Sequence, residues 1–180
     1  MKAYKDYSIR YSTRLEGFDY SADGAYYLTI CSYDGDQIFS SINEGTVTLS
    51  PIGEIIKREW KKTPSLRSYI TIDAIVIMPN HVHCILFIHH DSTEADHLRN
   101  EGSYLYFKDG YHNKFGPQSL NLASIIRGFK SAVTTEARKM GIKDRIWQSR
   151  YHERVIRNQK ELEKFRSYIA RNPFDWKPNW

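Results

Sequence analysis

Two histidines stand two positions apart within residues 75–90, "IVIMPNHVHCILFIHH", a segment that is otherwise mostly apolar. Side chains alternate faces along a β-strand, so His81 and His83 would project to the same side. Two imidazoles on one face can bind one divalent metal ion, because imidazole is a common metal ligand. Taken alone, a His-x-His pair is a weak signal that is more often incidental. The Pro79-Asn80 turn and the apolar run that follows favour a site at the mouth of a hairpin.

The surrounding chain predicts alternating strands and helices. Ser50 as N-cap and Pro51 at the first helical position predict a helix that ends at Thr63-Pro64. The last helix is expected to begin after Asn158 and to end at Asn172-Pro173. In chain order, we expect a strand at 25–33, a short extended segment with a Gly turn at 39–50, a helix at 51–63, strands at 68–78 and 81–88, a helix at 119–141, an extended basic-aromatic segment at 145–157 and a helix at 158–173. This order predicts an α+β fold with a small antiparallel sheet and helices packed on it.

The composition is that of a globular protein with one core. The 180 residues are 41% hydrophobic and predict a single domain at 1–180, with an excursion between core elements at about 89–118. Two cysteines without CxxC spacing argue against a disulfide framework and a thiolate zinc site. The first residues carry charges throughout, and the apolar runs are far shorter than the roughly 20 residues that span a bilayer, so a cytoplasmic protein is expected.

Charge and aromatic content point to a polyanionic partner. The formal net charge is +5, the pI is about 9.1 and 14% of the residues are aromatic. Aromatic side chains between basic ones suit single-stranded nucleic acid, because bases stack on rings and phosphates attract cations. For any single residue, a core ring or a solvated charge is the more frequent alternative. The candidates for DNA contact are Arg127, Lys130, Arg145, Arg150, Arg154 and Arg157, with Trp147 as a ring for base stacking.

Two motifs resemble a known family. The segment "MPNHVHCILFI" resembles the HUH motif (His, hydrophobic residue, His) of the single-tyrosine HUH transposases, the insertion-sequence-200-like group. The segment "IWQSRYHERVIRNQKELEKFRSYIARNP" is similar to the C-terminal signature of the REP-associated tyrosine transposases in that group. The resemblance extends from about Tyr26 to Trp176. It implies an RRM-like (ferredoxin-like) fold with helices packed on one side of the sheet, and an HUH endonuclease that cuts and rejoins single-stranded or hairpin DNA during transposition.

The resemblance also implies the site residues. It puts the catalytic tyrosine in the final helix, four residues before the Asn of "NP". In this sequence the tyrosine is Tyr168 and the asparagine is Asn172. Positions i and i+4 share a helix face, so a phenol and an amide oxygen can be presented to one site. The expected metal is Mg²⁺ or Mn²⁺, with His81, His83 and Asn172 as ligands. Tyr151 is the second candidate nucleophile, because its extended segment offers no i+4 ligand. In the alternative reading, Tyr168 packs in an amphipathic helix and Asn172 caps it.

The chemistry implied is a phosphotyrosine transfer. Attack of the phenol on phosphorus would leave a 5′-phosphotyrosine and free a 3′-hydroxyl, and rejoining would then need no ATP. Accordingly the sequence has no GxxxxGK[ST] motif. Related transposases are known as dimers, with sites shared between subunits, and as monomers, so a homodimer is one candidate assembly.

The sequence leaves three other classes of protein to compare with a transposase. A histidine-triad hydrolase is excluded because the third slot of the alternating motif is Ile85. A structural metal centre is disfavoured, since two histidines without Cys or an acidic partner make a weak closed site. A non-catalytic, domesticated nucleic-acid-binding protein remains the alternative to an active transposase.

Overall fold

The structure is a computed structural model that describes residues 18–89 and 120–177. Its strands are β1 (Gly24–Cys31), β2 (Ser40–Asn43), β3 (Thr46–Leu49), β4 (Ile70–Ile77), β5 (His81–Ile88) and β6 (His152–Ile156). Its helices are α1 (Pro51–Leu66), α3 (Leu122–Lys139) and α4 (Gln159–Asp175), with a short 3-10 helix η1 (Tyr33–Gly35). In these described ranges, no helix is both long and apolar enough to span a membrane. Most of the predicted 89–118 excursion lies outside the described residues.

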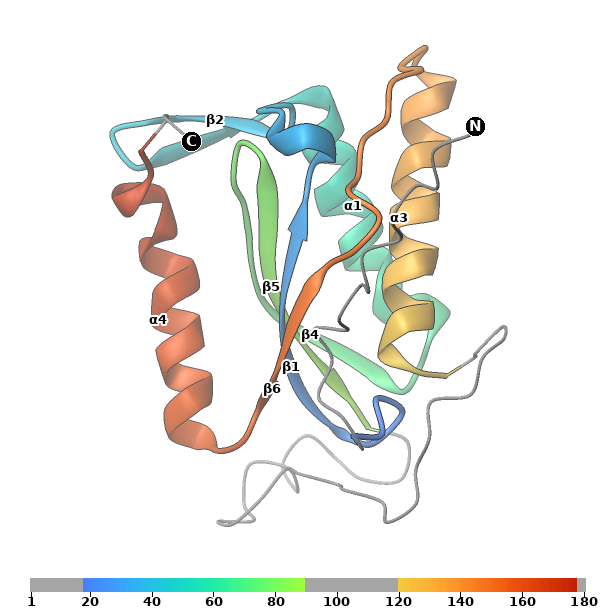
Figure 1. The fold of residues 1–180 in the computed structure, drawn as a ribbon, viewed down its shortest axis with the longest axis vertical. Coiled ribbons are helices and arrows are strands. Elements are labelled where there is room, and N and C mark those ends of the chain that lie inside the picture. The colour runs from blue at the N-terminus through green and yellow to red at the C-terminus, as the bar shows by residue number, and fades with distance from the viewer. Residues whose placement is uncertain (1–17, 90–119, 178–180) are drawn as a thin grey trace, which may run out of the picture.

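The main sheet has four strands in the order β4-β5-β1-β6, and every neighbouring pair is antiparallel (Figure 1). With α1 between β1 and β4, and α3 between β5 and β6, this is the βαββαβ arrangement of ferredoxin-like folds. The hairpin β2–β3 forms a separate small sheet. The predicted α+β fold with an antiparallel, ferredoxin-like sheet is therefore confirmed.

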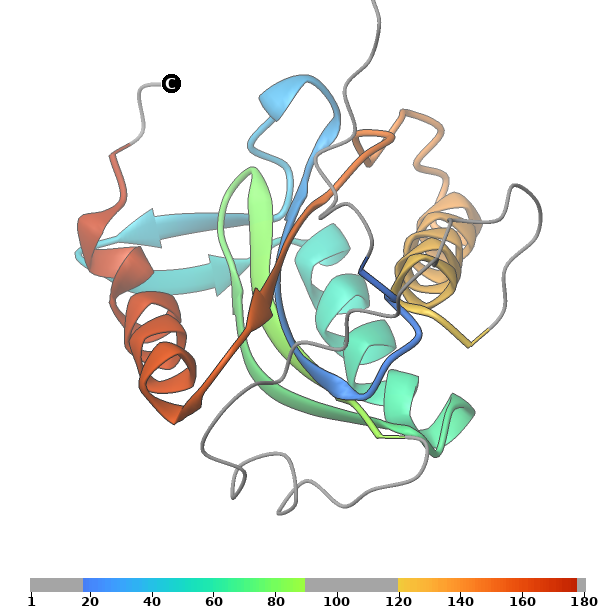
Figure 2. The ribbon, with the colours of Figure 1, turned by 60° about the horizontal axis from the view of Figure 1, so that its bottom comes forward.

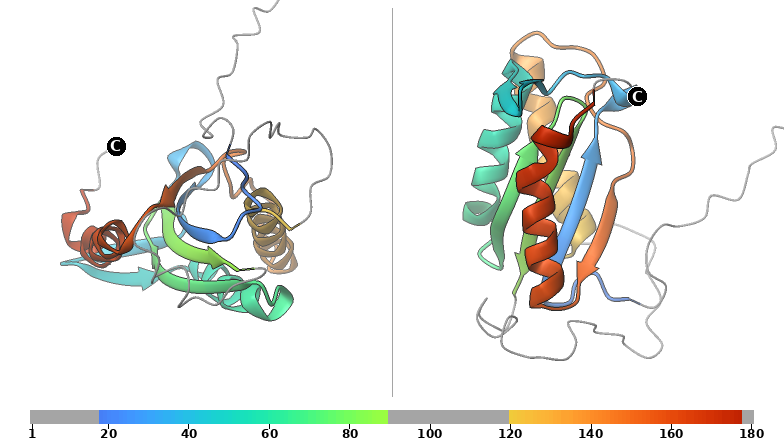
Figure 3. Two further views of the ribbon diagram at one scale, coloured as in Figure 1. Left: turned by 90° about the horizontal axis from the view of Figure 1, so that it is seen from below. Right: turned by 90° about the vertical axis from the view of Figure 1, so that its left-hand side faces the viewer.

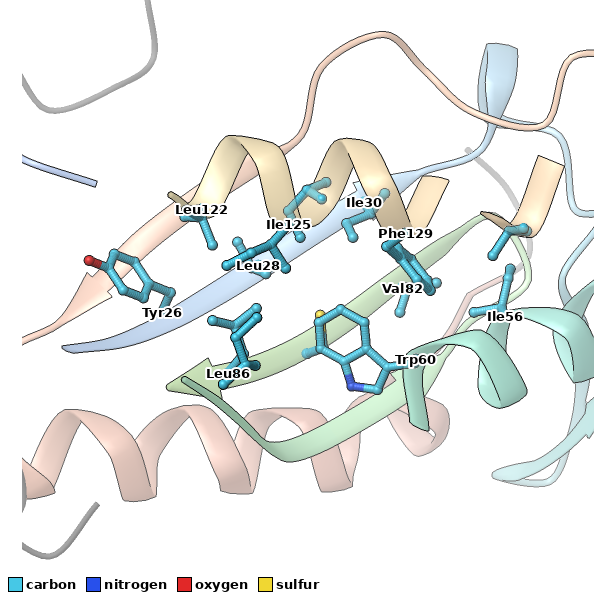
Figure 4. Close-up of a cluster of buried hydrophobic side chains, with 14 of the residues drawn as sticks. Tyr26, Leu28, Ile30, Ile56, Trp60, Val82, Leu86, Leu122, Ile125 and Phe129 are labelled. Atoms are coloured by element: carbon cyan, nitrogen blue, oxygen red, sulfur yellow. The ribbon is translucent and has the colours of Figure 1, made fainter. Parts of the chain in front are cut away.

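The larger core lies between the sheet and the helices α1 and α3. Figure 4 shows side chains from β1, β5, α1 and α3 that point toward one another. Leu28 and Leu86 of the sheet, Trp60 of α1 and Phe129 of α3 are at most 3% exposed. The Trp60 and Phe129 rings meet edge to face at 5.1 Å. This cluster buries the face of the sheet that carries the even-numbered residues of β5.

The last helix covers the opposite face, so the expectation that the helices pack on one side was wrong. Figure 3 shows α4 on one side of the sheet, with α1 and α3 on the other. Leu162 and Ile169 of α4 pack against Ile85 and Phe87 of β5 in a second apolar cluster. The reason is the apolar character of β5 on both faces: Val82–Ile88 is buried at every position. A strand of this kind needs a helix on each side.

Both prolines near helix ends lie inside their helices, which differs from the predicted ends. The helix α1 continues through Pro64 to Leu66, and α4 continues through Pro173 to Asp175. Each proline lacks the N–H that would donate to the carbonyl four residues earlier, but only two helical residues follow it, so the distortion affects little of the helix. The predicted starts are confirmed, because Ser50 accepts from the Gly53 amide and Asn158 accepts from the Glu161 amide. Asn172 is therefore not a cap residue but lies within α4.

Candidate active site

The two histidines lie at the start of β5, on the face of the sheet that α4 covers. Their ring centroids are 4.5 Å apart. His83 is 5% exposed, and His81, the first residue of the strand, is partly buried. The neighbouring Val82 and Cys84 point into the larger core on the other face. The alternation expected from the sequence therefore brings both imidazoles to one side.

Hydrogen bonds hold each ring through its Nδ1 atom. In His81, Nδ1 lies 2.6 Å from the Oδ1 of Asn80, a carbonyl oxygen that can only accept, so this nitrogen donates. In His83, Nδ1 lies 2.7 Å from the Tyr27 hydroxyl and 3.0 Å from the Thr29 hydroxyl. Partners on Nδ1 orient a ring and direct its Nε2 toward a ligand, as in many metal sites. The Nε2 atoms are thus the nitrogens that a metal ion would use.

Burial keeps both histidines neutral near pH 7. It lowers the pKa of His81 from its usual 6.5 to about 4. Burial, reinforced by the neighbouring His81, lowers the pKa of His83 to about 3. A neutral imidazole has the lone pair that metal coordination requires. Burial also raises the pKa of the Tyr27 phenol, which keeps this hydroxyl protonated beside His83.

The lowered pKa values predict loss of stability in acid. In the unfolded chain these histidines take up protons near pH 6.5, but the folded chain does so only near pH 3 to 4. The unfolded state therefore binds more protons in that window, and the free energy of unfolding falls as the pH falls through it. Urea unfolding in a chelating buffer, between about pH 7 and pH 5, measures this slope.

In the variant His83→Gln, the free energy of unfolding should change less with pH than in the wild type. The control His152→Gln removes an exposed histidine and should show the same pH dependence as the wild type. Equal slopes in the wild type and in His83→Gln would contradict the prediction.

Tyr168 on α4 approaches the histidine pair of its own chain. Its ring centroid is 5.3 Å from that of His83 and 6.2 Å from that of Tyr27, both with edge-on geometry. Its side chain is 49% exposed, so the ring rests on the site while much of it is open to solvent. The tyrosine helix and the histidine strand are thus brought together within one subunit.

A pocket of about 370 Å³ lies where these residues meet. Asn172 lines it together with His81 and Tyr168, as the i, i+4 spacing predicts. Asp175, which the sequence analysis did not single out, also lines it, as do Asn80, Trp176 and Lys177.

The donor set of this pocket fits a divalent cation. The imidazole of His81 and the amide of Asn172 line the pocket, and the His83 ring lies 4.5 Å behind that of His81. Two neutral imidazoles and an amide oxygen suit a metal such as Mn²⁺. In the described part of the chain, no three residues of the His, Cys, Asp and Glu types form a metal-binding cluster. The Asn172 amide lines the pocket and is the group that could serve as a third ligand from this chain, with DNA oxygens or water completing the shell.

An ion pair between Arg166 of α4 and Asp73 of β4 joins the helix to the sheet, two residues before Tyr168 in the chain. Nε and Nη2 of Arg166 each lie 2.8 Å from one oxygen of the Asp73 carboxylate, in the fork geometry of a bidentate pair. The pairing of β4 with β5 shifts register between Ile72 and Ile75, which leaves Asp73 and Ala74 in a bulge. Ala74 packs in the α4 cluster, so the bulge gives α4 two consecutive residues of β4.

We expect Arg166→Met to loosen α4 selectively. The pair is partly exposed, with 40% and 21% of the side chains accessible, so its loss should cost on the order of 1 kcal/mol. Native-state hydrogen exchange should show faster opening of α4, with little change in β5. Arg171→Met, at an exposed position of the same helix, is the matched control. Equal protection of α4 in Arg166→Met and in the wild type would contradict this role.

The second tyrosine candidate lies on the other side of the sheet. Tyr151 packs against the larger core, and the Lys130 ammonium is 5.9 Å from the centroid of its ring. This core is separated from His83 by the sheet itself. The geometry therefore favours Tyr168 over Tyr151.

The predicted DNA-contacting residues fall into different regions. Arg154 lies on the site face, with its guanidinium carbon 5.7 Å from the Phe165 ring centroid. Arg145 lies in the loop beside η1, because the amide of Tyr33 donates to the Ile146 carbonyl. Arg150 and Arg157 are exposed in the segments that flank β6, and Arg127 is exposed on α3, which covers the opposite face.

Two of these side chains make contacts within the protein. The ammonium of Lys130 donates to the backbone carbonyls of Gln148 (2.8 Å) and Arg150 (3.0 Å), and burial lowers its pKa to about 8. It therefore holds the 148–150 segment rather than presenting a charge to DNA. The partly buried Trp147 ring packs against Phe39 (4.9 Å) and Phe129 (5.8 Å) at the border of the larger core, so much of it is used in packing.

Three contributors to the site lacked a usable sequence signal. Tyr27 and Thr29 reach His83 only because β1 pairs with β5, in a register where Thr29 faces His83. Trp176, whose ring is 5.9 Å from that of His81, follows α4 only because this helix continues past Pro173. Asn80 directly precedes His81 and could have been recognised as its partner.

Comparisons with known proteins agree with this architecture. No family model matches the chain. An uncharacterized protein of Haemophilus influenzae is 31% identical over 176 residues, which cover 93% of this chain and 89% of that protein. The solved structure of a REP-associated tyrosine transposase bound to a REP hairpin is similar at a TM-score of 0.54 and 20% identity, covering 97% of this chain and 74% of that one. The chain therefore belongs to the same family as the Haemophilus influenzae protein, and it has the fold of a REP-associated tyrosine transposase.

Proposed function

We propose that this protein is a transposase-type endonuclease that cuts and rejoins single-stranded DNA through Tyr168. One observation carries the proposal: the Tyr168 ring lies 5.3 Å from that of His83 in its own chain, beside a pocket that Tyr168 shares with His81 and Asn172. A phenol, two neutral imidazoles and an amide in one place are the groups that metal-assisted phosphotyrosine chemistry needs. The fold shared with a REP-associated tyrosine transposase supports the same function.

In each step of the reaction, the phosphorus atom exchanges one P–O bond for another. The Tyr168 oxygen attacks phosphorus, its proton passes to a base or to solvent, and the bond to the 3′ oxygen breaks. The 3′ oxygen leaves as a hydroxyl, and the 5′ end stays joined to the protein as a phosphotyrosine. A 3′-hydroxyl then attacks the same phosphorus and releases the tyrosine, so the bond energy is conserved.

The chain's own groups have separate tasks in this proposal. His81, His83 and Asn172 would hold a divalent cation, Mg²⁺ or Mn²⁺, which would polarise the scissile phosphate and stabilise the charge on its oxygens. Asn80, Tyr27 and Thr29 orient the two rings through Nδ1. Arg154 on the same face and Arg145 near the end of β1 are candidates for contacts with the DNA backbone.

The test is formation of a covalent adduct. Purified protein is incubated with Mn²⁺ and labelled single-stranded oligonucleotides, with and without a hairpin, and then denatured. A labelled band at the mass of protein plus DNA is expected, and chelation of the metal should remove it. Tight hairpin binding without an adduct under any metal condition would instead support a non-catalytic nucleic-acid-binding protein.

A further inference from the structure

A second pocket lies next to the active-site pocket, on the side of the β2–β3 hairpin. It has a volume of about 390 Å³, and Trp176 lines both pockets. Figures 1 and 2 show the end of α4 beside this hairpin, and α4 contacts β3 directly. Pro79, one residue before Asn80 of the active-site pocket, forms part of its wall. We call it the hairpin pocket, and its chemistry comes mainly from Gln37, Ser41, Glu44, Phe174 and Trp176.

The aromatic part of this pocket is unusually open. Phe174 is 73% exposed although its ring lies directly against Gly45 of the hairpin turn, where a Cβ atom would overlap the ring. Gly45 has a φ of +77°, and Glu44 before it has a φ of 48°, as in a tight hairpin turn. The turn thus supports the phenyl ring, while most of the ring surface stays open to solvent. An open, supported ring is a stacking surface for a flat partner.

The polar part of the pocket selects a neutral partner. Of the described residues that line it, none is Lys or Arg, and Glu44 contributes a carboxylate that repels phosphate. Ser41 offers a hydroxyl that can both donate and accept a hydrogen bond. A nucleobase combines a stacking face with an edge of donors and acceptors, and it carries no charge. A volume of about 390 Å³ lies in the range of roughly 300–1,000 Å³ that holds ligands of nucleoside size.

We infer that the hairpin pocket binds the base of a nucleotide next to the scissile phosphate. This inference rests on the proposed function, which puts that phosphate in the active-site pocket. Trp176 lies between the two pockets with its ring 5.9 Å from that of His81, so a nucleotide joined to the phosphate there would reach the hairpin pocket with its base. A carboxylate only accepts hydrogen bonds, so Glu44 favours bases with an amino group (adenine, cytosine or guanine) over thymine, whose single N–H lies between two carbonyl oxygens that the carboxylate repels.

The experiment measures binding rather than cleavage, so that it can be interpreted without catalysis. Tyr168→Phe protein is titrated with a fluorescent single-stranded oligonucleotide and with copies in which each nucleotide in turn is abasic. At one position near the bond that the wild type cuts, base removal should weaken binding by roughly 10-fold or more. Adding Phe174→Ala should weaken binding of the intact oligonucleotide by a similar factor, and should have no further effect on that abasic copy.

Leu66→Ala, which removes an exposed apolar side chain of α1, is the matched control and should leave every affinity unchanged. Glu44→Gln should reduce the preference for amino-bearing bases over thymine at the same position. The inference is overturned if Phe174→Ala and base removal weaken binding independently at every position, or if neither has an effect. Absence of a covalent adduct in the wild type would overturn the proposed function, whereas the binding cycle would still show whether Phe174 and a single base act together.

Discussion

Tyr168→Phe should reduce the covalent protein–DNA adduct to below detection. Phenylalanine keeps the ring that contacts His83 and Tyr27 but lacks the oxygen that would attack phosphorus. With 49% of the side chain exposed, removing the hydroxyl should change the free energy of unfolding little. The measurement is adduct formation with Mn²⁺ and a labelled oligonucleotide, beside urea unfolding of both proteins.

Tyr151→Phe is the matched control for this experiment. Its ring packs against the larger core on the opposite face of the sheet, so the adduct should form at about the wild-type rate. Loss of the adduct in Tyr151→Phe, with retention in Tyr168→Phe, would refute the assignment. An unchanged adduct in both variants would show that neither tyrosine is the nucleophile.

His81→Ala and His83→Ala should each abolish metal-dependent cleavage while most of the DNA affinity remains. Each variant removes one of two imidazoles whose ring centroids are 4.5 Å apart, and a single imidazole would hold the cation only weakly. DNA affinity should persist, because phosphate contacts elsewhere supply most of it. Mn²⁺ titration followed by electron paramagnetic resonance measures the metal, and anisotropy measures the DNA.

Two further variants define the specificity of this effect. Tyr27→Phe removes one hydroxyl beside Nδ1 of His83 and should weaken Mn²⁺ binding by about 10- to 100-fold. His89→Ala, just beyond the other end of β5, should leave Mn²⁺ binding unchanged, since the His89 ring is hydrogen-bonded to Thr71. Full Mn²⁺ affinity in both His81→Ala and His83→Ala would rule out the proposed ligands.

Local patterns in the sequence were sufficient for most elements and for the central residues of the site. Ser50 and Asn158 cap helices where predicted, because a cap depends on the side chain and an amide three residues away. His81 and His83 share a face because strand alternation is a local property. Tyr168 and Asn172 share a pocket because positions i and i+4 share a helix face.

Contacts between distant segments were not predicted. The side of the sheet that α4 covers depends on β5 being apolar on both faces, which a short apolar run does not reveal by itself. Trp147 and Lys130 looked available for DNA, but Trp147 packs against Phe39 and Phe129, and Lys130 binds two backbone carbonyls. Sequence alone cannot distinguish a ring or a charge used in packing from one left on the surface.

The sequence by itself determined the candidate chemistry of this protein: a histidine pair on a strand, and a tyrosine and an asparagine on one face of a helix. Only the tertiary structure decided that these groups meet within one chain. That outcome depends on strand pairing that puts Tyr27 and Thr29 on His83, and on the bulge in β4 that lets Asp73 bind Arg166. Both are long-range contacts, and their free energy exists only once the whole sheet is assembled.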